Sequence, residues 1–123
     1  MSKQQFLIRK ANRGLGEGCI LGTYQEQLNF NTSGDLTIVP ASVTRISKIH
    51  KLFLVGSGAS NIRLWSGPSS ENDPISGQMN FVSSWALALD SDDFTLMGEA
   101  GKAIILNSST AIQIGGIIVY SIT

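Results

Sequence analysis

The length, composition and charge of this chain exclude several classes of protein. At 123 residues and 42% hydrophobic, it suits a single domain with one small core. Nine Lys and Arg balance nine Asp and Glu, so the basic excess that nucleic-acid-binding proteins normally carry is missing. Only 15% of the residues are charged, against about 25% in typical proteins. This composition is typical of a β-sandwich whose surface is partly covered by copies of itself or by a partner.

The first thirty residues differ from the rest of the chain. The apolar run Phe6-Leu7-Ile8 stands beside a small basic cluster made by Arg9, Lys10 and Arg13. The run is too short for the apolar part of a signal peptide, and no stretch is long enough to span a bilayer. We therefore expect synthesis in a cytoplasm and no membrane partner. We divide the chain into residues 1–30, an N-terminal arm (1–19) with an approach strand (20–30), and residues 31–123, a β-sandwich domain.

The next residues read as short strands separated by turns. A turn over 31–35 leads to a strand over 36–39, which Pro40 ends. Two strand pieces are expected over 43–47 and 49–56, with a bulge or register change near Lys51. In the strand over 62–65, Ile62 and Leu64 point inward and Trp65 has the opposite parity.

A polar loop rich in Ser, Gly, Pro and Asn covers 66–77. Further strands are expected around Met79 and Phe81, over 85–89, and over 94–97, with an acidic turn at 90–93. The chain ends in a hairpin, because two β-rich runs flank a polar turn at 107–110. In its last run one parity forms an apolar face that we expect in the core: Ile112, Ile114, Ile118, Tyr120 and Ile122.

The other parity of the last run, with Ile117 and Val119, is apolar as well. We expect a second sheet or a neighbouring subunit to cover it, and we add the outward Trp65 as a third subunit-interface candidate. The pair Gly115-Gly116 permits a bulge or the close approach of another backbone. The whole chain predicts an all-β, single-domain, jelly-roll-like β-sandwich of about eight or nine short strands with an extended N-terminal arm.

Residue patterns for catalysis or for cofactor binding are weak throughout. The cluster 14–18 is Gly-rich but lacks the Gly-Lys-Ser/Thr ending of a phosphate-binding loop. The carboxylates have no calcium-loop spacing and read as solvated turns: Glu71, Asp73, Asp90, Asp92 and Asp93. His50 has no second His or Cys at metal-ligand spacing, and no nucleophile elbow is present. Cys19 is the one cysteine, which excludes an internal disulfide, and it reads as a small buried hydrophobe. We expect no enzyme activity, no cofactor and no metal.

The order of motifs from residue 36 to residue 123 resembles the small jelly-roll virion structural proteins of tailed bacteriophages, which include capsid decoration or cement proteins. The resemblance rests on four phrases: a Lys-rich entry into a strand that ends in small residues (48–59), an alternating strand ending in Ser-Gly (61–67), a Gly-Glu-Ala phrase leading through an apolar strand to Asn-Ser-Ser (98–109), and a Gly-Gly-apolar-x-apolar-Tyr ending (115–120). Ser83-Ser84-Trp85 departs from the Gly or Pro that the family usually has before the acidic turn.

The resemblance implies a homotrimer that binds the phage major capsid protein on the outer capsid surface and stabilises the shell. The unmatched arm would supply the capsid contact, through Phe6, Leu7, Ile8, Arg9, Lys10 and Arg13. An alternative with the same fold is a receptor- or carbohydrate-binding module of a phage fibre or spike tip. That alternative would use Trp65 and the 66–77 loop as its recognition surface.

Overall fold

A computed structural model describes residues 23–90 and 96–123, which form nine strands and one short 3-10 helix. The elements are β1 (Thr23–Phe30), β2 (Gly34–Val39), β3 (Ser47–Gly56), β4 (Ser60–Ser66), η2 (Ser69–Glu71), β5 (Met79–Phe81), β6 (Trp85–Asp90), β7 (Leu96–Met97), β8 (Ile104–Ser108) and β9 (Ile114–Ile122). Residues 1–22 and 91–95 lie outside the described residues. These two ranges include the predicted capsid-contact side chains, Cys19, Asp92 and Asp93.

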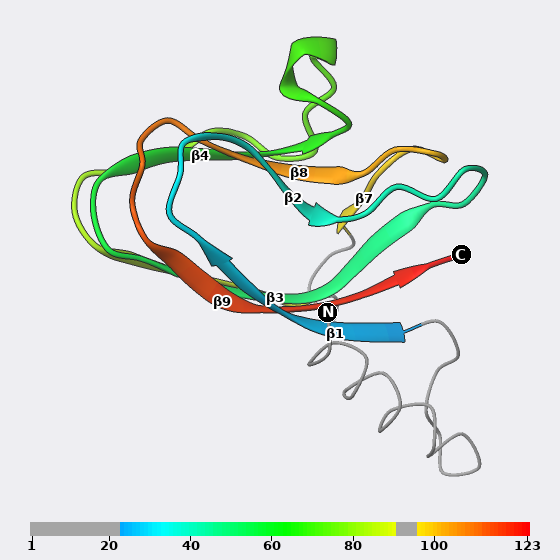
Figure 1. The fold of residues 1–123 in the computed structure, drawn as a ribbon, viewed down its shortest axis with the longest axis horizontal. Coiled ribbons are helices and arrows are strands. Elements are labelled where there is room, and N and C mark those ends of the chain that lie inside the picture. Colours follow the sequence, from blue (N-terminus) through cyan, green and yellow to red (C-terminus); the bar gives the residue numbers. More distant parts are fainter. Residues whose placement is uncertain (1–22, 91–95) are drawn as a thin grey trace, which may run out of the picture.

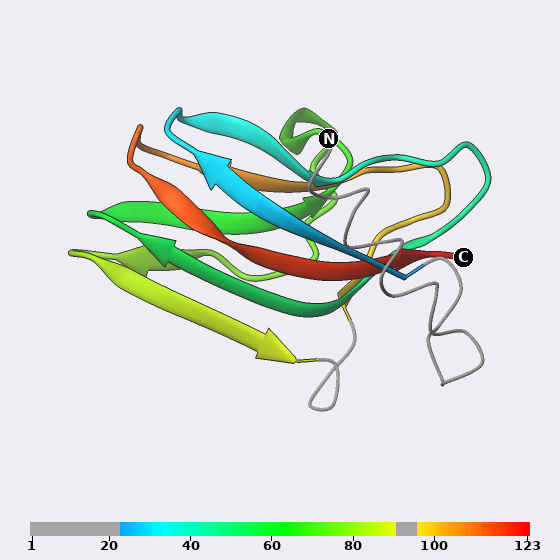
Figure 2. The same ribbon diagram turned by 60° about the horizontal axis from the view of Figure 1, so that its bottom comes forward.

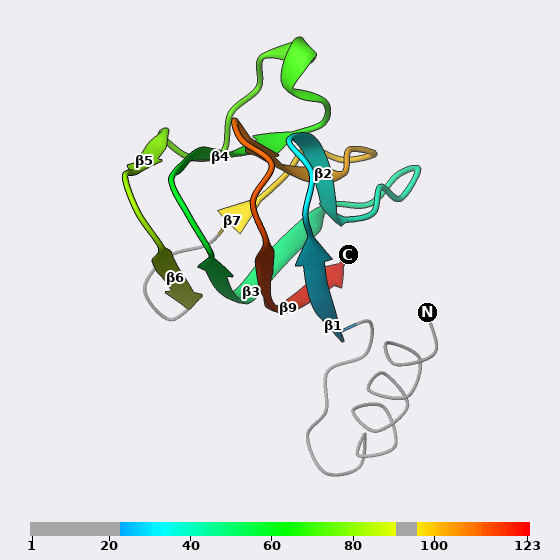
Figure 3. The same ribbon diagram turned by 60° about the vertical axis from the view of Figure 1, so that its left-hand side comes forward.

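The strands form two antiparallel sheets that face each other (Figure 1). The five-stranded sheet has the order β1-β9-β3-β6, with β7 pairing the start of β3. The four-stranded sheet has the order β2-β8-β4-β5. The two layers are seen from the side in Figure 3, where β6, β3, β9 and β1 follow one another along one of them. The predicted all-β sandwich of eight or nine short strands is confirmed.

The core lies between the two sheets and follows the alternation of each strand. Ile62 and Leu64 of β4 are fully buried, as predicted, and so are Ile114 and Ile118 of β9. Tyr120 is 2% exposed, and Ile112 and Ile122 are partly buried against the same cluster. Burying one such aliphatic side chain contributes about 1.5–3 kcal/mol, so the last strand carries a large share of the core.

The predicted irregularity in β3 is present. The register of β3 against β9 shifts between Ile49 and Lys51. Ile49 and Leu52, three positions apart, are therefore both buried. A regular strand would send them to opposite faces, so the shift lets β3 keep one apolar face along its whole length.

The strand piece predicted over 43–47 is wrong for all but its last residue. Residues 43–44 form a turn, and Val43 is 91% exposed. The Arg45 amide donates to the Ser42 carbonyl at 3.2 Å, and Ile46 exchanges backbone hydrogen bonds of 2.9 Å with Thr123. The chain must turn here to pass from β2 in one sheet to β3 in the other, which overrides the local preference of Val43 and Ile46 for strand.

Candidate interaction surface

The outer face of the five-stranded sheet carries an apolar patch. We call the outward apolar side chains of β3, β6 and β9 the outer apolar patch. They are Phe53 and Val55 from β3, Ala86 and Ala88 from β6, and Ile117 and Val119 from β9. Phe53 lies opposite Ile117 in the sheet register and opposite Ala88 on its other side. Phe53 is 48% exposed, and Val55 and Ile117 are 45% exposed. Strand alternation produces this patch, because the inward neighbours of these residues fill the core.

Two shallow grooves flank the pair formed by Phe53 and Ile117. Both grooves are lined by this pair, which stands between them as a ridge. One groove extends toward Val55 and Gly115, and the other toward Lys51 and Val119. A second apolar surface with a ridge of its own can pack into these grooves.

The rim of the outer apolar patch is polar but nearly neutral. The exposed outward residues of β1 are amides: Gln25, Gln27 and Asn29. The side-chain amide of Gln113 donates to that of Asn29 beside one groove. At the other groove Lys51 pairs with Asp90 at 3.9 Å, which cancels their charges locally. A charged partner would find little to recognise here, whereas a neutral apolar one would meet no repulsion.

The opposite outer face, on the four-stranded sheet, is partly covered by the chain itself, and its exposed outward residues are polar: Asp35, Thr37, Asn61 and Asn80. Residues 67–78 leave the end of β4, rise above the outer side of this sheet (Figure 1) and return beside β4, where Pro74 pairs with Trp65. Backbone bonds tie this segment to β4: the Ile75 amide donates to the Leu64 carbonyl at 2.8 Å, and the Ser66 amide donates to the Asp73 carbonyl at 2.8 Å. Ile105 of β8, which lies opposite Trp65 in the register, is only 6% exposed, although both of its neighbours in sequence are buried in the core.

Trp65 lies on this covered face. Trp65 forms an isolated antiparallel β-bridge with Pro74 of the 67–78 segment. The Arg63 guanidinium lies over the Trp65 ring, 5.0 Å from its centre. The Trp65 side chain is half-buried, and its Nε1 is buried with no hydrogen-bond partner among the described residues. Trp65 and the pair Ile117 and Val119 are thus on opposite faces of the sandwich, so the structure does not bring the three predicted interface residues together.

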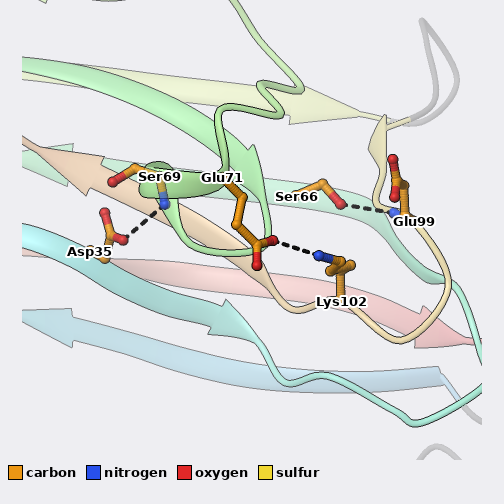
Figure 4. Close-up of polar contacts among 6 residues, drawn as sticks. All are labelled: Asp35, Ser66, Ser69, Glu71, Glu99 and Lys102. Carbon is orange, nitrogen blue, oxygen red and sulfur yellow. Dashed lines mark hydrogen bonds and ion pairs between the residues drawn. The ribbon is translucent and has the colours of Figure 1, made fainter.

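The covering segment is held at its η2 end by polar contacts shown in Figure 4. Asp35 of β2 accepts a hydrogen bond from the Ser69 amide at 3.0 Å and another from the Asn107 side chain at 2.8 Å. Burial alone raises the pKa of Asp35, but these hydrogen bonds outweigh it and lower the pKa below the usual 3.8. The carboxylate form of Asp35 therefore holds the segment.

A second group of charges closes the same region. Lys102 pairs with Glu71 of η2 at 2.5 Å, and this hydrogen bond raises the pKa of Lys102 above 10.5. The Glu99 amide donates to Ser66 Oγ at 2.9 Å. The Glu99 carboxyl shares a hydrogen bond with Asp73, which raises the pKa of Glu99 above 4.5 because two like charges resist joint ionisation. These contacts explain Glu71 and Asp73 as parts of a structural latch.

The remaining candidates for a catalytic or metal site are His50 and the carboxylates. His50 Nε2 lies 2.8 Å from the hydroxyl of the buried Ser121 on the neighbouring strand. Over residues 23–90 and 96–123 there is no group of three or more His, Cys, Asp or Glu that could hold a metal ion. Within the same residues no helix is both long and apolar enough to cross a membrane.

Sequence reasoning missed Phe53 and Val55, the largest β3 contributors to the outer apolar patch. The sequence did contain a signal for them. After the register shift, Phe53 and Val55 alternate in step with Lys51, a charged residue that is expected to face outward. The dense run 52–55 hides that parity, since every residue in it is apolar.

Comparison with known proteins adds little to these observations. No protein-family model matches the sequence, and no curated protein matches it either. One solved structure with a similar β-rich fold comes from Bacillus endospore appendages, described as a novel family of disulfide-linked pili. It has 12% sequence identity and a TM-score of 0.41, and the match covers 85% of this chain and 93% of that chain. A likeness this distant carries no conclusion about function.

Proposed function

We propose that this protein is a non-enzymatic structural protein of a tailed-phage virion, a capsid decoration or cement protein that assembles as a homotrimer on the outer capsid surface. One observation carries the self-assembly in this proposal. The sandwich covers part of one outer face with its own 67–78 segment and leaves polar side chains on the rest, whereas the described residues leave the other face, the outer apolar patch, uncovered. Contiguous exposed apolar surface of this kind marks an interaction site.

A second copy of the chain is the occupant that we propose for the outer apolar patch. The whole chain has no net charge, and the rim of the patch is made largely of amides. Three copies can therefore bring such patches together around a three-fold axis without repulsion. The Ile117 side chain, at 45% exposure beside Phe53, would be the centre of the contact.

The placement on a capsid is supported by the resemblance of residues 36–123 to phage decoration proteins. Under this proposal the residues 1–19, with Phe6, Leu7, Ile8 and the basic Arg9, Lys10 and Arg13, bind the major capsid protein. Many copies on a closed shell gain avidity from modest single contacts, so a short arm suffices. No described observation favours the fibre-tip alternative, because Trp65 is half-buried beneath Arg63 and the 67–78 segment.

Removal of residues 1–19 tests the capsid part of the proposal. The shortened protein should remain a trimer and keep its melting temperature but should no longer co-sediment with purified capsids. A shortened protein that still binds capsids at full occupancy would remove the arm from the contact. Absence of the full-length protein from purified particles would rule out the virion location itself.

A further inference from the structure

The free edges of the two sheets differ in how they are protected against pairing with another chain. A free sheet edge presents unpaired backbone groups, and proteins usually blunt it with inward charges, bulges, Pro or very short strands. In β1 the inward parity includes Glu26, next to the buried Leu28. β2 has a register shift between Thr37 and Val39 and ends before Pro40, and β5 has only three residues. Three of the four edges therefore carry a recognised protection.

The fourth edge, β6, carries none over its first five residues. Within residues 23–90 and 96–123, β6 pairs with β3 on one side only, and it forms the border of its sheet in Figure 2. Its sequence Trp85-Ala86-Leu87-Ala88-Leu89 has no charge, no Pro and no Gly. Its register against β3 runs without a shift from Lys51–Asp90 to Gly56–Trp85. This edge is straight, apolar and ready to accept a strand.

The side chains of β6 indicate what kind of strand it accepts. Leu87 and Leu89 point inward and pack against the core, yet both remain only partly buried. Ala86 and Ala88 point outward and are exposed. An added strand with apolar residues on the inward parity and small residues on the outward parity would complete the cover of Leu87 and Leu89.

We propose that β6 pairs antiparallel with β6 of a second copy, across a two-fold axis that passes through Ala88. In this register Leu87 stands opposite Leu89 of the second copy, and Ala88 stands opposite itself. Asp90 falls opposite Ala86 of the second copy and away from its own counterpart, while Lys51 of the same chain balances its charge at 3.9 Å. Opposed residues of an antiparallel pair share a face, so both leucine pairs would lie over the core.

This contact goes beyond the proposed function and does not rest on it. A two-fold edge contact joins the two five-stranded sheets side by side and is distinct from any contact through the centre of the outer apolar patch. If both contacts exist, the edge links one assembly to the next. The Ala88-centred register also keeps the added strand away from the Trp85 end, where Trp85 stacks on Phe81 at 4.5 Å and the chain crosses to the other sheet.

A cysteine at position 88 tests the proposal directly. Cys19 is the one natural cysteine, so the test uses a Cys19→Ser background. Directly opposed Cα atoms in an antiparallel pair lie about 4.5–5.5 Å apart, within the range of a disulfide. Ala88→Cys should therefore form disulfide-linked dimers under mild oxidation. The matched control is Gln25→Cys, which is exposed and outward on the protected edge β1.

Paired thiols meet at an effective concentration of about millimolar, so at micromolar protein the Ala88→Cys dimer should form at least about a hundredfold faster than the control dimer. Adding Ile117→Asp should leave that rate unchanged, which separates the edge from the outer apolar patch. Equal rates for Ala88→Cys and Gln25→Cys would overturn the proposal.

Charge exchange at the same position gives an independent test. Ala88→Glu and Ala88→Lys should each lose the two-fold association, because like charges face each other across the axis. An equimolar mixture of the two variants should regain it as a heterodimer. Loss without recovery in the mixture would show that position 88 does not face itself, and the proposal would then be wrong.

Discussion

Ile117 and Ile118 are neighbours in sequence with opposite surroundings. Ile118 is fully buried in the core, and Ile117 is 45% exposed in the outer apolar patch. Strand alternation alone separates them, and the sequence predicted this separation from the parity of the last run. The two residues therefore offer a matched pair for separating folding from assembly.

Truncation of each isoleucine to alanine should give different results. Ile118→Ala should lower the free energy of unfolding by about 2–5 kcal/mol, because it leaves a cavity in the core. Ile117→Ala should change the free energy of unfolding of the monomer by less than about 0.5 kcal/mol. Urea denaturation at low protein concentration measures both. Equal losses would mean that the two faces of β9 are buried alike in the single chain.

Gly116 is the position in the last strand where a side chain is least tolerated. A Cβ placed there would lie 1.8 Å from the Phe53 carbonyl oxygen, so the predicted close approach of another backbone is confirmed. Gly116→Ala should cost about 1–3 kcal/mol or more, because backbone atoms of β3 have to move. Gly77→Ala is the control, since no atom lies within 4 Å of its added Cβ. A neutral Gly116→Ala in denaturant titrations would disprove this packing.

At the scale of elements, strands could be predicted where apolar residues alternate regularly. They could not be predicted where long-range contacts determine the local structure. β4 and β9 follow their alternation, and the shift near Lys51 could be read from the broken alternation of β3. The turn at 42–45 could not be read, because Val43 and Ile46 favour strand locally. The hairpin predicted at the end of the chain is wrong, because β8 pairs with β2 and β4 in one sheet whereas β9 pairs with β1 and β3 in the other. This partition depends on pairing across the whole chain, which no local pattern records.

The 67–78 segment is the element whose role the sequence concealed. Its Ser, Gly and Pro content indicated only a loop, whereas its contacts with Leu64, Asp35 and Lys102 make it a cover for one face. Those partners are between 11 and 34 positions away in sequence from the residues they hold, so no local motif predicts the contacts. Trp65, which we expected to face outward, is accordingly half-buried beside this segment.

The hydrogen bonds that Asp35 accepts should make the stability of the protein depend on pH. The pKa of Asp35 is lowered in the folded protein, so its carboxylate contributes stability that is present above the unfolded pKa of about 3.9. That contribution is lost as the pH falls through the folded pKa, below 3.8. Asp35→Asn should therefore be less stable than the parent at pH 6, with the difference shrinking below about pH 4.

Thermal melting of the parent and Asp35→Asn across this pH range measures the effect. A difference in melting temperature that stays constant from pH 6 to pH 3 would show that the Asp35 charge plays no part in holding the segment.

At the scale of the whole molecule, the two outer faces of the sandwich are unequal. One is covered by the chain's own segment, and the other presents a ridge of Phe53 and Ile117 between two grooves. The sequence predicted the outward apolar character of Ile117 and Val119 and therefore two of the six residues of the outer apolar patch. It did not predict that Trp65 would be on the opposite face, because the partition of strands between sheets is a property of the complete fold.

A charge in the outer apolar patch should prevent assembly without unfolding the chain. Ile117→Asp places a carboxylate at the centre of the proposed contact, where burial would cost several kcal/mol. Val43→Asp is the matched control, because Val43 is 91% exposed in a turn outside the patch. Only Ile117→Asp should reduce the native mass, while both variants keep the melting temperature of the isolated chain.

The native mass of the unaltered protein tests the central claim most directly. Light scattering across a concentration series should give the mass of a trimer of the 13.2 kDa chain, or of trimers linked through β6, at high concentration. The trimer should be lost in Ile117→Asp. A single 13.2 kDa species at every concentration would contradict the account, because the outer apolar patch would then be exposed in the functional form.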